Sequence, residues 1–170
     1  MKWGFLVLGL LLLVLLQTSA VPAFEILGVA PNILLVMLCC WAVVRVEAES
    51  LVLVPLAGLL IGLLSFQGTA ESIAAFAPIV LLAALKGVVS SGARMALRTE
   101  YFWTLAIVIV ATLLHFTALA VAVEVAGSRI DWVSAVTDRM VPSVVVNVLI
   151  GLIVYWLVRL PTSRPQPRVI

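Results

Sequence analysis

Residues 102–126 read FWTLAIVIVATLLHFTALAVAVEVA, a run of 25 residues in which Glu124 is the one charged side chain. A helix rises about 1.5 Å per residue, so about 20 apolar residues cross a hydrocarbon core that is about 30 Å thick. This run therefore predicts a membrane-spanning helix, and it is the longest of several such runs.

Apolar runs of this kind occupy most of the chain. We expect spans at residues 3–21, 31–44, 50–66, 73–93, 102–126 and 141–158. Charged residues make up only 11% of the 170 residues, whereas a soluble domain carries roughly 25%. The sequence therefore predicts an all-α integral membrane protein, a compact bundle of six transmembrane helices within residues 1–160. Run 31–44 reaches only about 21 Å as a helix, so a five-span bundle is the alternative.

Basic residues are distributed unequally between the predicted loops. With a cytoplasmic N-terminus and six spans, the inner side holds Lys2, Arg45, Arg94, Arg98, Arg159, Arg164 and Arg168. The outer side holds only Arg129 and Arg139. The positive-inside rule therefore places both termini in the cytoplasm. We expect residues 161–170, with three prolines, to form a disordered basic cytoplasmic tail.

Three polar side chains lie inside predicted spans, where burying a polar group is costly. Lys86 lies near the inner end of its span, so it either snorkels to the cytoplasmic interface or contacts a neighbouring helix or a ligand. His115 and Asn147 lie at similar depths in the last two spans. We expect a neutral His115, hydrogen-bonded to an amide or a backbone carbonyl of a neighbouring helix.

Small residues recur at four-residue spacing in two predicted spans. Gly58 and Gly62 form a GxxxG pattern in one span, and Ala83, Gly87 and Ser91 repeat in the next. Such stripes let helix backbones approach closely inside a membrane. They predict packing against a neighbouring helix of the same chain or against a partner protein.

The sequence contains no catalytic motif such as HExxH, CxxC or a glycine-rich phosphate loop. Its single histidine, two cysteines and eight carboxylates are too few and too scattered to predict a metal or acid–base site. Cys39 and Cys40 are adjacent within an apolar run, and we interpret them as packing residues. A net charge of only +2 does not indicate a nucleic-acid partner. We therefore expect a protein that is not an enzyme and holds no cofactor or metal.

The middle of the chain resembles a known family. Residues 30–35 (APNILL) begin a short apolar run that ends at Arg45, and residues 56–65 (LAGLLIGLLS) follow. Over residues 30–93 this pattern resembles the bacterial rod shape-determining protein MreD family. Its members show a Pro-Asp before a leucine-rich helix and then a charged turn with Arg, which correspond to Pro31, Asn32 and Arg45. Asn32 replaces the usual Asp, and Gly62 stands where a second aspartate is expected, so roles of those acids do not carry over.

The resemblance implies a non-catalytic scaffold of the cell-elongation machinery in the bacterial cytoplasmic (inner) membrane. Such a protein binds the single-span protein MreC and helps couple MreB filaments to the synthases that build lateral-wall peptidoglycan. It also implies a fold similar to the substrate-binding components of energy-coupling-factor transporters. That similarity supplies the alternative function, a vitamin-binding subunit. Its pocket would take a few of its polar or aromatic groups from among Glu124, Asp131, Trp132, His115 and Asn147.

Overall fold

The structure is a computed structural model, and it describes residues 2–44, 47–65, 68–90 and 97–159. Within these ranges the chain is helical, apart from loops and one isolated β-bridge between Ile26 and Val29. The elements are α1 (Lys2–Ser19), η1 (Val21–Ala23), α2 (Ile33–Val44), α3 (Glu47–Leu64), α4 (Thr69–Ser90), α5 (Leu97–Val125), α6 (Trp132–Ser134), the π-helical η2 (Ala135–Met140) and α7 (Val141–Arg159). Arg45, Ser91 and the expected tail at 161–170 lie outside the described residues.

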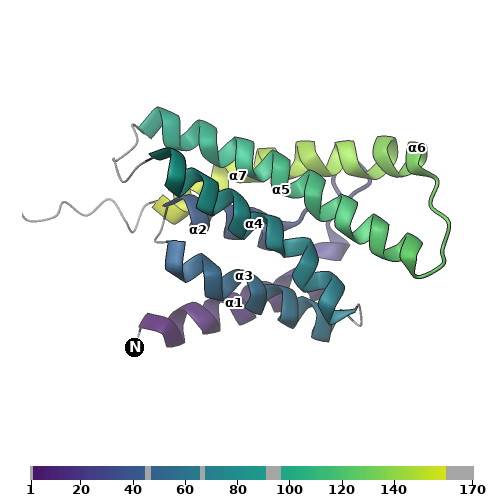
Figure 1. The fold of residues 1–170 in the computed structure, drawn as a ribbon, viewed down its shortest axis with the longest axis horizontal. Coiled ribbons are helices and arrows are strands. Elements are labelled where there is room, and N and C mark those ends of the chain that lie inside the picture. Colours follow the sequence, from purple (N-terminus) through teal and green to yellow (C-terminus); the bar gives the residue numbers. More distant parts are fainter. Residues whose placement is uncertain (1, 45–46, 66–67, 91–96, 160–170) are drawn as a thin grey trace, which may run out of the picture.

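The helices pack side by side as one elongated bundle (Figure 1). Four helical segments in the described ranges are long and apolar enough to cross a membrane, namely Trp3–Ala23, Thr69–Lys86, Thr99–Val125 and Trp132–Arg159. Ile33–Val44 and Glu49–Leu64 are shorter apolar helices. These segments indicate a helical membrane protein, as the composition predicts, and each predicted run overlaps one of them.

Helix α2 is short and lies at the centre of the bundle, where it packs against α1, α3, α4, α5 and α7. Its sequence is apolar on all sides rather than along one stripe, which is typical of a buried helix. The buried residues of α2 are Leu34, Leu35, Val36, Leu38, Cys39, Cys40, Ala42 and Val43. Both cysteines are free and belong to this core, as expected of packing residues.

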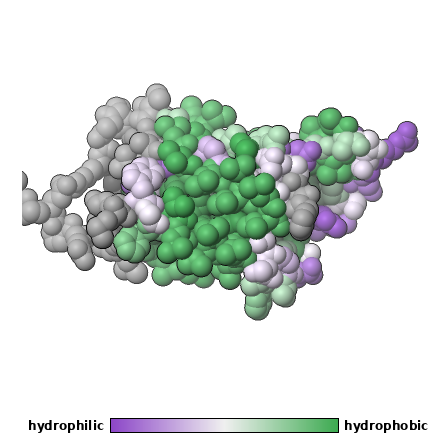
Figure 2. Space-filling view, turned by 90° about the horizontal axis from the view of Figure 1, so that it is seen from below, coloured by the Kyte–Doolittle hydropathy of each residue, from purple (hydrophilic) through white to green (hydrophobic). Residues whose placement is uncertain are grey.

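Helix α1 lies at the edge of the bundle, where it packs on α3 and α2 (Figure 1). Phe5, Leu8 and Leu12 on α1 are large apolar side chains that remain more than half exposed. Figure 2, which views this side of the molecule, shows a broad hydrophobic surface with hydrophilic residues gathered at one end. A patch of this size indicates that lipid or another protein covers this side.

The last helical segment begins at Trp132, earlier than the predicted start of the final span at residue 141. Pro142 has no N–H group to donate within a helix. A proline is therefore typical of the first turn of a helix, as in a span that begins at residue 141. In the structure the turn before it is π-helical, and the N–H group of Val141 donates to the carbonyl of Val136. The wider turn lets the helix continue through the proline.

Candidate functional site

Asn32 joins three helices at the half-buried N-terminus of α2. Its Oδ1 accepts a hydrogen bond from the backbone N–H of Leu35 at 3.0 Å, so Asn32 is the N-cap of α2. Its own N–H donates to Oδ1 of Asn147 on α7 at 2.9 Å, and its Nδ2 lies 3.3 Å from Nε2 of His115 on α5. The first N–H groups of a helix lack partners within the helix, and here side chains supply them. Asparagine is among the residues preferred at a helix N-cap.

The hydrogen bonds of His115 define its tautomer. Its Nδ1 lies 3.1 Å from the carbonyl oxygen of Ala75 on α4. A carbonyl oxygen only accepts, so Nδ1 carries the hydrogen and Nε2 accepts from the Asn32 amide. Asn147 in turn donates from Nδ2 to Oγ1 of Thr112 at 3.2 Å. His115 is therefore a neutral imidazole bonded to an amide and a backbone carbonyl, as expected.

Gln17 on α1 completes this set of contacts, and it was not predicted from the sequence. Its Nε2 donates to the carbonyl of Pro31 at 3.0 Å, and its Oε1 accepts from the N–H of Leu34 at 3.2 Å. The available signal was a lone amide side chain near the end of a leucine-rich run. Together, the side chains of Gln17, Asn32, Thr112, His115 and Asn147 form a polar network inside the bundle.

Lys86 on α4 contacts a neighbouring helix, which is one of the alternatives left open by its position. Its Nζ donates to the carbonyl of Val43, in the last turn of α2. The last carbonyls of a helix have no partner within the helix and attract cations. Lys86 therefore caps the C-terminus of α2, while the polar network surrounds its N-terminus.

The GxxxG pattern packs α3 against α4 of the same chain. A Cβ atom added at Gly58 would lie 2.7 Å from Cα of Ile73, and one at Gly62 would lie 2.6 Å from Cα of Thr69. Both glycines therefore serve an internal contact that α4 covers. Ala83 is buried in the core, Gly87 lies within α4, and Ser91 is outside the described residues.

At the opposite end from the loop around Gly127, an ion pair joins α5 and α7. Nη1 of Arg159 lies 2.7 Å from Oε2 of Glu100, and the hydroxyl of Tyr155 contacts both side chains. The sequence did not predict this pair, because the two residues are 59 positions apart. This cluster fixes the end of the bundle that the charge distribution predicts to be cytoplasmic.

The structure places the five side chains considered for a vitamin pocket in different parts of the described chain. His115 and Asn147 belong to the polar network, whereas Asp131 caps α6 by accepting from the N–H of Val133 at 3.1 Å. Asp131 lines a separate pocket of about 390 Å³, beside α5 and η2. Trp132 and Glu124 are exposed.

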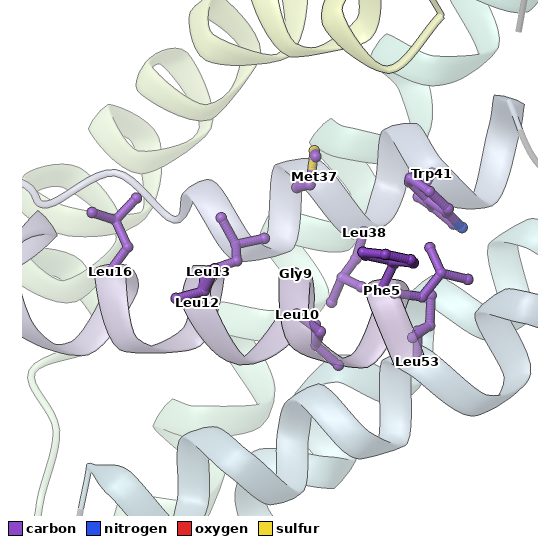
Figure 3. Close-up of a pocket in the computed structure, with 11 residues that line it drawn as sticks. Phe5, Gly9, Leu10, Leu12, Leu13, Leu16, Met37, Leu38, Trp41 and Leu53 are labelled. Carbon is purple, nitrogen blue, oxygen red and sulfur yellow. The ribbon is translucent and has the colours of Figure 1, made fainter. Parts of the chain in front are cut away.

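An apolar groove runs along α1, with a volume of about 570 Å³ (Figure 3). It is lined by Phe5, Leu6, Gly9, Leu10, Leu12, Leu13 and Leu16 of α1, Met37, Leu38 and Trp41 of α2, and Leu53 of α3. Leu10, Leu38 and Leu53 are buried and form its floor, while Phe5 and Leu16 are exposed. The groove therefore lies open at the edge of the bundle.

The fold and these features define a helical membrane protein with a buried polar network and an apolar groove at its edge. Among the described residues, no group of three or more His, Cys, Asp or Glu side chains could hold a metal ion. No protein-family model, curated protein or solved structure matches the chain.

Proposed function

We propose that this protein is a non-catalytic membrane scaffold of the bacterial cell-elongation machinery. It binds an MreC-like single-span protein and helps couple MreB filaments to lateral-wall peptidoglycan synthesis, and thereby to rod shape. The sequence resemblance to MreD supports this proposal, with Pro31 and Asn32 at the start of α2. The structural observation that carries it is the apolar groove, whose shape fits a partner's transmembrane helix.

The groove is elongated along α1. Its lining extends from Phe5 to Leu16, a distance of about 16 Å at about 1.5 Å per residue. Figure 3 shows these α1 side chains opposite Met37 and Trp41 of α2. An apolar lining of this length along one helix matches about three turns of an apolar helix better than it matches a compact polar ligand.

Gly9 has no side chain, so a partner helix can approach the backbone of α1 closely at this position. A Cβ atom added at Gly9 would meet no heavy atom within 4 Å, so the backbone of α1 is bare at this point of the groove. Helices in membranes associate by van der Waals packing at such small residues. Unlike Gly58 and Gly62, whose space α4 fills, Gly9 is available to a second protein.

The proposal includes a topology of six spans in the inner membrane with both termini in the cytoplasm. Helix α2 has only 12 residues, about 18 Å, so it crosses together with the non-helical segment before it. Non-helical backbone at membrane depth is tolerated where protein surrounds it. Gln17 and Asn147 supply that protection by bonding the backbone of residues 31–34. A fold similar to the substrate-binding components of energy-coupling-factor transporters remains part of this proposal.

Purification of the tagged protein from its native membrane in mild detergent tests the function. The proposal expects mass spectrometry to recover an MreC-like single-span protein, together with wall synthases or MreB. Recovery of a vitamin with an energy-coupling ATPase module would replace the scaffold with the alternative function. Recovery of neither would also reject the scaffold.

A further inference from the structure

A second pocket, of about 420 Å³, lies beside the polar network among α1, η1, α3, α4 and α5. Its polar lining residues are Gln17, Thr18, Asn32, Ser65, Ser72 and His115. Apolar walls include Phe76, whose ring is buried, and Leu119. The set contains no carboxylate, lysine or arginine, and the tautomer of His115 is neutral. The described lining of this polar pocket is therefore uncharged.

Ser72 lines the polar pocket and has an unsatisfied hydroxyl group. It is 2% exposed, and its Oγ has no hydrogen-bond partner among the described residues. The hydroxyls of Thr18 and Ser65 instead bond to carbonyls of their own helices. A buried hydroxyl without a partner costs free energy, so a partner supplied from outside the protein would stabilise the site.

The remaining hydrogen-bonding capacity of the lining defines the chemistry of that partner. Gln17 and Asn32 each use one amide N–H in the polar network and keep a second one. Together with the hydroxyl of Ser72, these groups favour a ligand that presents carbonyl or hydroxyl oxygens. With no cation in the lining, nothing compensates a phosphate or a carboxylate. The apolar walls suit an apolar body attached to the polar group.

We propose that the polar pocket binds a neutral, oxygen-bearing group on an apolar body, with Ser72 donating its hydroxyl hydrogen to that oxygen. Two sources have this chemistry: the glycerol ester region of a neutral lipid and a free neutral small molecule. The proposal is independent of a partner helix in the apolar groove, because the two pockets share no lining residue.

Thermal unfolding of the purified full-length protein in detergent tests the proposal, with 1-monooleoylglycerol as the probe. The lipid 1-monooleoyl phosphatidic acid, which differs by a charged phosphate, is the ligand control. We expect the neutral lipid to stabilise the protein and the charged one to do so less. Mass spectrometry of organic and aqueous extracts of the purified protein separates a retained lipid from a retained free molecule.

The variant Ser72→Ala removes one hydroxyl from a buried position without adding volume. Loss of one hydrogen bond predicts about three- to tenfold weaker binding of the probe, or of the molecule recovered by extraction. The unliganded variant should be at least as stable as the wild type, because its buried donor was unpaired. Thr117→Val is the control, since that hydroxyl is exposed, bonds to Leu113 of its own helix and lies outside the pocket lining.

Two results would overturn the proposal. Equal binding by Ser72→Ala and the wild type would show that Ser72 does not contact the ligand. If the extracts contain no retained molecule and the probe does not stabilise the protein, water alone fills the pocket.

Discussion

Asn32 on α2 and His115 on α5 are 83 positions apart in the sequence, yet their side chains meet with 3.3 Å between Nδ2 and Nε2. The same asparagine caps α2 through Leu35 and bonds to Asn147 on α7. One amide side chain thus satisfies a helix terminus and sets the tautomer of a half-buried histidine. These bonds join helices that are distant in the sequence, and leaving a half-buried polar group without its partner costs free energy.

The variant Asn32→Asp tests the direction of the hydrogen bond to His115. Aspartate keeps an oxygen for the N–H of Leu35, but it presents an acceptor to an imidazole nitrogen that also accepts. We expect the free energy of unfolding to fall by about 1–3 kcal/mol, measured by denaturant unfolding in detergent. Asn32→Ser, which keeps a cap without placing a charge against the ring, should lose less. Aspartate can also draw a proton onto Nε2 and form an ion pair with the imidazole, so the measurement is made at alkaline pH, where the ring stays neutral. Wild-type stability of Asn32→Asp under that condition would refute the assigned tautomer.

The close approach of α3 and α4 predicts different outcomes for two glycines. Gly58→Ala places a methyl group 2.7 Å from Cα of Ile73, so the helices must separate, and we expect a loss of about 1–3 kcal/mol. Gly151→Ala is the matched control, because its Cβ would lie 3.7 Å from the nearest side-chain atom, in ordinary contact. Gly151→Ala should be neutral or stabilising by up to about 1 kcal/mol. The stability of both variants is measured by thermal unfolding in detergent. Equal changes for Gly58→Ala and Gly151→Ala would contradict the close packing of α3 against α4.

We expect a smaller loss of stability when the contact of Lys86 with the C-terminus of α2 is removed. Lys86→Met removes the donor to the carbonyl of Val43 but keeps an apolar stem, so we expect a folded protein that is less stable by about 1 kcal/mol. Lys86→Arg retains a cationic donor and should recover most of that loss. Unchanged stability in Lys86→Met would mean that Lys86 only snorkels to the interface.

The positions of the helices could be predicted from sequence because apolar runs of sufficient length have few alternatives to a membrane helix. The early start of the last helical segment could not be predicted, because a π-helical turn before Pro142 leaves no local sequence signal. The depth of His115 and Asn147 in their predicted spans singled them out as polar residues within the membrane, and the structure places Asn147 in the buried set and His115 half-buried.

The partners of those groups were harder to predict. Gln17 bonds to the backbone of Pro31 and Leu34, and which loop a side chain reaches depends on how distant helices pack. Ser72 was missed for the same reason, since a serine near a helix start carries no signal that α3 and α5 will bury it. The spacing of residues along one segment does not reveal which groups of distant helices come into contact.

The central claim, that a partner helix binds in the apolar groove, is tested most directly by comparing two glycines of α1. A Cβ atom at Gly4 or at Gly9 would meet no atom within 4 Å, so both positions have space for the start of a side chain, and the folded yield of each leucine variant is measured first. Only Gly9 lines the groove. The measurement is the amount of MreC-like protein that co-purifies with each folded variant in mild detergent. The account predicts at least a tenfold loss for Gly9→Leu and a wild-type yield for Gly4→Leu, and equal recovery from both would contradict it.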